Sequence, residues 1–108
     1  MAQRRKKRGG TPEFSGWDSL LDATPVATLD LHGDTTPDAS RRTRDFITTQ
    51  ARISGGQVVH IITGRGMGSR GGAVLPGTVK NLLTGELSRF VQEFDRDLHD
   101  GGFMVRLR

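Results

Sequence analysis

The chain has no cysteine, no tyrosine and only one tryptophan among its 108 residues. Without cysteine it forms neither disulfide bonds nor thiolate zinc sites, and such a composition suits a reducing compartment. No apolar run approaches the roughly 20 residues that a membrane helix needs, and no apolar signal-peptide stretch follows the basic residues at the start. We therefore expect one cytoplasmic domain without a membrane partner.

Excess positive charge is confined to one short segment. The formal net charge is +4, yet five of the sixteen basic residues lie in a single run, which leaves eleven basic against twelve acidic residues. The run consists of Arg4, Arg5, Lys6, Lys7 and Arg8. Such a block repels itself and stays unfolded, while it attracts polyanions by releasing their counterions. Residues 1–12 are therefore predicted to be a disordered basic tail, either merely solvated or acting as a non-specific nucleic-acid arm.

Hydrophobic periodicity predicts a folded domain over residues 26–108, preceded by an N-terminal arm or short helix over residues 13–25. In the arm, four apolar residues recur at helical spacing: Phe14, Trp17, Leu20 and Leu21. In the domain, we expect strands over residues 26–32, 57–63, 89–94 and 102–107, and helices over residues 37–54 and from Leu75 to Gly85.

This β-α-β-α-β-β order predicts a two-layer α/β sandwich. Crossovers through helices imply three parallel strands, and the closing hairpin adds an antiparallel one, so the four-stranded sheet is mixed. Right-handed crossovers place both helices on one face. The other face is left open, and the alternation of the strands assigns five polar residues to it: Thr28, Asp30, His32, Arg106 and Arg108.

Polar residues follow the first two strands where each strand ends. Asp30 and His32 lie two residues apart, so they project to the same face, and Gly64 begins a glycine-rich loop after the second strand. Ligands of α/β sheets bind at the edge where parallel strands end. A carboxylate beside an imidazole fixes its tautomer and helps it to transfer protons. His60 lies inside an apolar strand and is more typical of a hydrogen-bonded structural histidine.

The glycine-rich loop is predicted to bind phosphate. Glycine permits close backbone approach, so backbone N–H groups of the loop can cradle an anion, and arginine adds planar donors. The phosphate-binding candidates are Gly64, Gly66, Gly68, Ser69 and Arg70, together with Arg65. Residues 66–71 match the pattern G-x-G-x-x-G, but the next helix begins several residues later, which argues against a dinucleotide site. A P-loop is excluded because no Gly-Lys-Ser/Thr is present.

These motifs in combination resemble the Smr (small MutS-related) domain family, in its stand-alone bacterial form. The resemblance runs from about residue 25 to the end. Its motifs are Leu29-Asp30-Leu31-His32-Gly33, Ile61-Ile62-Thr63-Gly64-Arg65-Gly66, Gly71 through Val74-Leu75, and Gly101 through Leu107. The resemblance implies a nucleic-acid-binding α/β sandwich, often a nicking or RNA-cleaving endonuclease. It marks Asp30, His32, Gly64, Arg65 and Gly66 as critical.

Two positions depart from the family pattern. Thr63 stands where many members have histidine, which leaves His32 as the principal candidate acid or base. Asp34 stands where many have an apolar residue, and its negative charge weakens anion binding unless a metal uses it.

We therefore predict an endonuclease in which His32 is the acid or base. Asp30 would orient His32 or hold a divalent cation such as Mg²⁺ or Mn²⁺. Asp30 is the only metal ligand proposed. Arg65 and the loop N–H groups would stabilise charge on the phosphate. Further arginines would track the nucleic-acid backbone with the tail: Arg41, Arg42, Arg44 and Arg70.

The partners expected are DNA or RNA, with ribosome-bound RNA included, and the chain is expected to act as a monomer. The sequence does not choose between DNA repair and messenger RNA quality control. Two alternatives remain open: a non-catalytic nucleic-acid or ribosome-binding module, and a protein-interaction domain.

Overall fold

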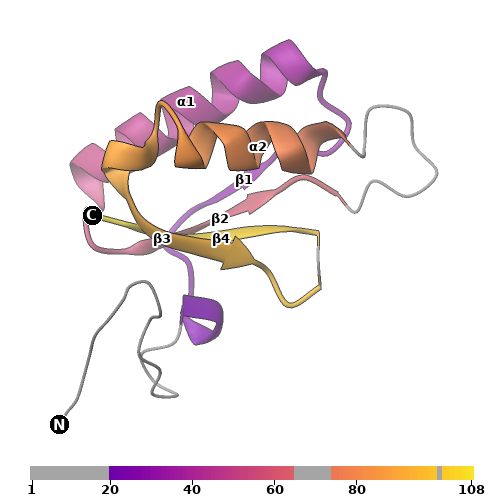
Figure 1. The fold of residues 1–108 in the computed structure, drawn as a ribbon. Helices are drawn as coiled ribbons and strands as arrows, with labels where there is room; N and C mark the ends of the chain where they lie inside the picture. Colours follow the sequence, from indigo (N-terminus) through magenta and orange to yellow (C-terminus); the bar gives the residue numbers. More distant parts are fainter. Residues whose placement is uncertain (1–19, 65–73, 100) are drawn as a thin grey trace, which may run out of the picture.

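The computed structural model describes residues 20–64, 74–99 and 101–108 (Figure 1). The basic tail and residues 13–19 of the arm lie outside the described residues. In chain order, the elements are the 3-10 helix η2 (Leu20–Asp22), strand β1 (Thr28–Asp30), helix α1 (Thr36–Ile53), strand β2 (Val58–Ile62), helix α2 (Val74–Thr84), the 3-10 helix η3 (Ser88–Phe90), and strands β3 (Val91–Arg96) and β4 (Gly102–Leu107). The predicted β-α-β-α-β-β order is confirmed.

The four strands form one mixed sheet in the order β1-β2-β4-β3. Strands β1 and β2 are parallel, whereas β4 is antiparallel to both of its neighbours, β2 and β3. Three strands therefore run in the same direction, as predicted, but β4 lies between the second and the third. Both helices cover the same face of the sheet (Figure 1), which confirms the two-layer sandwich.

Helix α1 begins and ends where local chemistry favours a boundary. The hydroxyl of Thr35 accepts a hydrogen bond from the backbone N–H of Asp38 at 3.3 Å, and Pro37 occupies the first turn. At the other end, Gly56 adopts a positive φ of 83°, which glycine tolerates without strain. The helix thus spans 18 residues between the carboxyl edge of β1 and the start of β2.

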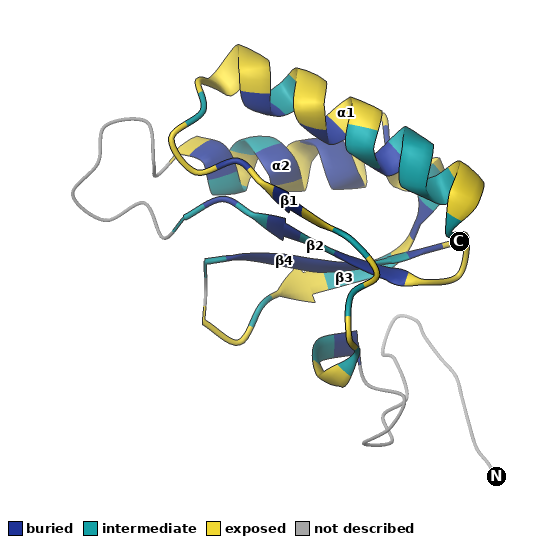
Figure 2. Cartoon of the chain, turned by 180° about the vertical axis from the view of Figure 1, so that it is seen from behind, coloured by how far each residue is buried: buried dark blue, intermediate teal, exposed yellow. Residues whose placement is uncertain are grey.

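The core lies between the sheet and the two helices (Figure 2). Its largest fully buried side chains include Phe103, Leu31, Ile47, Ile61, Leu75, Leu83 and Leu107. On the strands, successive side chains point to opposite faces, so Leu31, Ile61, Phe103 and Leu107 share the face that packs against the helices. The apolar faces predicted for the first and last strands are therefore correct.

The opposite face of the sheet is only partly open. Leu20 of η2 is buried there against Val58 and Met104, and Figure 1 shows η2 on the side away from the helices. In contrast, Asp30 and His32 remain exposed. The face predicted to be open is thus covered by the start of the described chain at one end and accessible at the other.

Two predicted strands have different bounds in the structure. The first is three residues long, although hydrogen bonds from Val26 N to Val58 O (2.9 Å) and from Leu31 N to Ile62 O (2.7 Å) extend its contact with β2. The third begins only at Val91, because η3 occupies the residues before it, and it continues to Arg96. Sequence periodicity does not detect such end effects.

Candidate functional site

Asp30 and His32 form a hydrogen-bonded pair where β1 ends. The Nδ1 atom of His32 lies 2.8 Å from Oδ1 of Asp30, and the backbone N–H of His32 donates to the same oxygen at 3.0 Å. The pair forms because residues i and i+2 of an extended chain share one face. With Nδ1 directed at the carboxylate, Nε2 is the ring nitrogen left for another molecule. The His32 side chain is 72% exposed, so such a molecule can reach it.

This pair changes the acidity of both groups. The hydrogen bond to Asp30 and the charge of that carboxylate raise the pKa of His32 above its ordinary value of 6.5, and Asp34 adds to the effect. The hydrogen bond from His32 in turn lowers the pKa of Asp30, although partial burial opposes the shift. Asp30 is therefore ionised at neutral pH, and the protonated fraction of His32 is larger than that of an isolated histidine.

The additional acidic residue beside the pair has a partner. Oδ2 of Asp34 lies 2.7 Å from the guanidinium of Arg42 on α1, and the charge of Arg42 also lowers the pKa of Asp30. The negative charge that the sequence places next to the expected phosphate site is therefore offset by a neighbouring arginine. Arg42, which was predicted to contact the nucleic-acid backbone, therefore forms an ion pair with a carboxylate in this structure.

Gly64 brings the start of the glycine-rich loop to His32. Its φ is +83°, a conformation that favours glycine, and a Cβ built there would lie 3.5 Å from the Cβ of His32. The structure thus brings together Asp30, His32 and Gly64, as the strand topology predicts. The other loop residues assigned to the site, Arg65, Gly66, Gly68, Ser69 and Arg70, lie outside the described residues.

The backbone N–H of Gly64 already has an acceptor. It donates to the carbonyl of Gly101 at 3.0 Å, and the N–H of Thr63 donates to the same carbonyl at 2.9 Å. Gly64 therefore offers an anion no free N–H in this conformation. Its visible contribution is the sharp turn by which the chain leaves β2 beside His32.

A second histidine–aspartate pair supports this turn. Nε2 of His60 lies 2.8 Å from Oδ2 of Asp97, and Oδ1 of Asp97 accepts the backbone N–H groups of His99 (3.1 Å) and Gly101 (2.9 Å). Burial raises the pKa of Asp97, but these hydrogen bonds together outweigh burial, so the pKa lies below its ordinary value. Asp97 thus shapes the β3–β4 turn, whose Gly101 carbonyl anchors Thr63 and Gly64.

Sequence reasoning predicted a structural role for His60 but did not identify Asp97 as its partner. An aspartate a few residues before a pair of glycines, as Asp97 stands before Gly101 and Gly102, is a recognisable sign of a turn closed by a side chain. The pairing with His60 depends on β4 lying beside β2, which the strand order decides.

Two more arginines expected to contact nucleic acid are already paired. Arg41 lies 3.0 Å from Asp38, and Arg44 lies 2.8 Å from Glu86 on the α2 side. Both remain largely exposed, and such surface pairs are weak, so an anion can compete for them. Their positive charge is nevertheless offset in this structure.

Metal ligands are sparse in the described part of the chain. Residues 20–64, 74–99 and 101–108 hold no group of three or more His, Cys, Asp or Glu side chains placed for a metal ion. Asp30, the ligand considered from the sequence, uses Oδ1 for His32 and keeps Oδ2. One carboxylate oxygen fits a cation that keeps most of its water, as Mg²⁺ often does.

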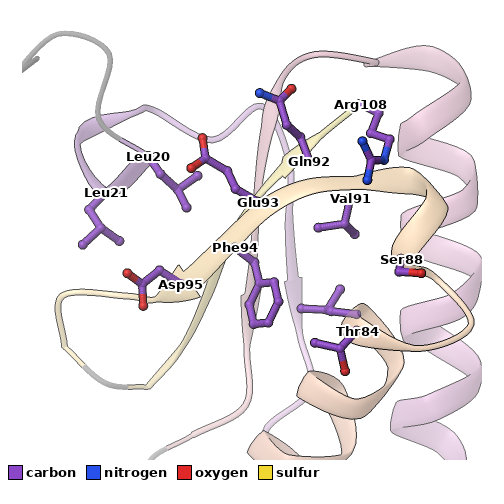
Figure 3. Close-up of a pocket in the computed structure, with 11 residues that line it drawn as sticks. Leu20, Leu21, Thr84, Ser88, Val91, Gln92, Glu93, Phe94, Asp95 and Arg108 are labelled. Carbon is purple, nitrogen blue, oxygen red and sulfur yellow. The ribbon is translucent and has the colours of Figure 1, made fainter. Parts of the chain in front are cut away.

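Among the described residues, the Asp30–His32 pair lies at an exposed edge of the sheet, with side chains that are 51% and 72% exposed. A cavity of about 600 Å³ lies elsewhere, between η2 and the edge strand β3 (Figure 3), and neither Asp30 nor His32 lines it. Its lining includes Leu20, Leu21, Val91 and Phe94, among others.

The fold and the site together define a small α/β domain with a polar, exposed edge at the carboxyl ends of two parallel strands. The family model of the Smr domain matches residues 29–108. The chain therefore belongs to the Smr domain family, as its motifs predict. No helix in the described part of the chain is long and apolar enough to cross a membrane.

One curated protein is similar to this chain in sequence. An uncharacterized protein of Treponema pallidum (strain Nichols) is 45% identical over 68 residues, which are 63% of this chain and 33% of that protein. The match thus covers about a third of the length of that relative.

Proposed function

We propose that this Smr domain binds nucleic acid and acts as an endonuclease that cleaves phosphodiester bonds with His32 as its acid or base. The observation that carries the proposal is the 2.8 Å contact between Nδ1 of His32 and Oδ1 of Asp30. It directs Nε2 towards solvent at the edge where Gly64 begins the glycine-rich loop. A carboxylate-oriented imidazole with one free nitrogen is a suitable proton-transfer group.

The chemistry depends on the nucleophile. In RNA, neutral Nε2 of His32 would take the proton of the 2′-hydroxyl as its oxygen attacks phosphorus. The phosphorus–O5′ bond then breaks, and the leaving oxygen takes up a proton from the imidazolium. In DNA, water must be the nucleophile: the same imidazole would accept its proton as the water oxygen attacks phosphorus. The bond from phosphorus to the leaving deoxyribose oxygen would then break, and the imidazolium would return the proton to that oxygen. Asp30 stabilises the imidazolium formed in either case.

Further groups are proposed to stabilise the negative charge that develops on the phosphate. Arg65 and the N–H groups of the loop, Gly66 and Gly68 included, are proposed to stabilise it, because preorganised donors at a developing negative charge dominate many rates. Ser69 and Arg70 would extend this cradle, and the basic tail would add sequence-independent affinity. Gly64 is proposed to act through the turn beside His32, since its own N–H is used.

A divalent cation is proposed only as an accessory to this site. Asp30 would hold it through Oδ2, and it would polarise a phosphate oxygen. If the nucleophile is a 2′-hydroxyl, the histidine suffices without metal.

The test compares wild type with His32→Ala on labelled RNA and DNA, each with and without EDTA. We expect cleavage by wild type and a loss of about 100-fold or more in His32→Ala, the usual contribution of a general acid or base, with binding retained. The matched control is His99→Ala, a histidine of the β3–β4 turn whose side chain is assigned no role in the reaction. If wild type and His32→Ala both bind and neither cleaves, the endonuclease proposal is wrong.

A non-catalytic nucleic-acid or ribosome-binding module is the second candidate. It is favoured by one observation: the His32–Asp30 pair is exposed, and water-excluded sites are the ones that strengthen catalytic electrostatics. Binding without cleavage in the same assay would support this candidate. Absence of binding to either polymer at low salt would instead point to a protein-interaction domain.

A further inference from the structure

Three arginines surround a pocket at the edge of the sheet opposite the candidate site. The pocket has a volume of about 340 Å³ and is lined by Thr48, Ala51, Arg52, Arg89, Phe90 and Arg108. These residues come from the last two turns of α1, from η3 and from the residue after β4. The backbone N–H of Arg108 donates to the carbonyl of Phe90 at 3.0 Å, which holds two of these elements together. We call this the arginine pocket.

The guanidinium groups of the arginine pocket are not paired with carboxylate side chains of the described residues. Within residues 20–64, 74–99 and 101–108, no carboxylate side chain forms an ion pair with Arg52, Arg89 or Arg108, and all three are exposed. The arginines further towards the start of α1 are each paired with an acid. Like charges that share a pocket repel one another, and an anion among them relieves that repulsion.

One of the three guanidinium groups is already positioned. The Cζ atom of Arg89 lies 4.8 Å from the ring centroid of Phe90, a cation–π arrangement. A guanidinium group held over a ring keeps its N–H donors directed outward in its own plane. That planar set of donors matches the oxygens of a phosphate.

A purely structural role accounts for only one of these residues. Arg52 is in the last turn of α1, where a positive charge interacts favourably with the helix dipole. This interaction leaves the guanidinium donors free. It does not involve Arg89 or Arg108, which belong to other elements and yet line the same pocket.

We infer that the arginine pocket binds a backbone phosphate of the nucleic acid, as a second contact distant from the His32 site. The inference rests on the proposed function and adds a length requirement to it. The two locations lie at opposite ends of α1 (Figure 1), whose 18 residues span about 27 Å at a rise of 1.5 Å each. At about 3.4 Å per stacked nucleotide, a stacked strand of roughly eight nucleotides spans both locations.

The test measures the affinity of labelled single strands of 20 and of 4 nucleotides, as RNA and as DNA, by fluorescence anisotropy. The variant R52Q/R89Q removes two charges from the arginine pocket. R41Q/R44Q is the matched control, because it removes two arginine charges from the same surface, both already paired with acids. Thermal unfolding of each variant verifies that it is folded.

We expect R52Q/R89Q to bind the 20-nucleotide strand about 25-fold more weakly in 0.1 M salt. Each phosphate contact on a single strand contributes about 0.7 to the slope of log K against log salt, so the slope should also fall by about 1.4. The 4-nucleotide strand, which is too short to occupy both locations at once, should lose several-fold less affinity than the 20-nucleotide strand, and R41Q/R44Q should lose several-fold less affinity than R52Q/R89Q.

Other results would overturn the inference in distinguishable ways. If R52Q/R89Q and R41Q/R44Q weaken binding equally, net charge and not the pocket determines affinity. If R52Q/R89Q binds both strands as wild type does, the pocket is not a contact. If wild type binds neither strand, the proposed function itself fails.

Discussion

Asp97 is predicted to be the side chain on which the turn beside the candidate site depends. Its carboxylate accepts three hydrogen bonds, from His60 Nε2 and from the backbone N–H groups of His99 and Gly101. Asp97→Ala removes every one of these acceptors. Gly101 then loses the contact that positions its carbonyl for Thr63 and Gly64, so both the fold and the site are affected.

The magnitude follows from how buried these groups are. A buried donor left without an acceptor costs about 1–3 kcal/mol, but His60 is 22% and Asp97 11% exposed, so water recovers part of the loss. We expect the free energy of unfolding to fall by about 2–3 kcal/mol. For a domain of this size, this corresponds to a melting temperature lower by about 10–20 °C.

Calorimetry or circular dichroism at pH 7 measures the change, with Asp97→Asn as the matched control. The amide oxygen of asparagine still accepts the two backbone N–H groups, so this variant should recover more than half of the loss. Asp97→Ala within 0.5 kcal/mol of wild type, or Asp97→Asn as unstable as Asp97→Ala, would refute this reasoning.

The same variant gives a pH test with a defined sign. The pKa of Asp97 is lower in the folded chain than its ordinary value of 3.8, so its contribution to stability is present above that value and lost as pH falls through the folded pKa. Wild type should therefore lose stability between about pH 5 and pH 2, and Asp97→Asn should lose less over this range.

Three further predictions concern single positions. In Asp30→Asn the pKa of His32 should fall towards 6.5, since the carboxylate raises it; NMR titration of the ring measures it, and an unchanged pKa would contradict the pairing. Gly102→Ala should cost about 3 kcal/mol or more in chemical denaturation, because a Cβ there collides with the backbone carbonyl of Ile61; a neutral change would contradict the register. Thr43→Val should raise stability by about 1 kcal/mol in the same assay, since the hydroxyl is buried without a partner among the described residues, and a loss would show that it has one.

Sequence reasoning predicted that Asp30, His32 and Gly64 lie together, because these residues obey local rules. Asp30 and His32 share a face through strand alternation, and Gly64 follows a strand that must run parallel to the first. Both consequences depend on short-range periodicity and on the handedness of crossovers, which the chain encodes locally. The family motifs cover the same residues, so resemblance and periodicity agree.

The ion pairs of the arginines were only partly predictable from the sequence. Arg41 lies three residues after Asp38 on the same helix, a spacing that permits an ion pair, whereas Arg44 contacts Glu86 only because α1 and α2 pack side by side. No local pattern predicts an ion pair between two helices. The number of arginines in a segment therefore overestimates the unpaired positive charge available to bind nucleic acid.

The sequence by itself determined the order of elements, the faces of the strands and the convergence of Asp30, His32 and Gly64, because these depend on local propensity and chirality. Only the tertiary structure decided that β4 inserts beside β2. That placement joins His60 to Asp97, occupies the N–H of Gly64 and brings Arg108 to Arg89. Contacts between residues distant in the chain depend on strand order, for which periodicity carries no signal.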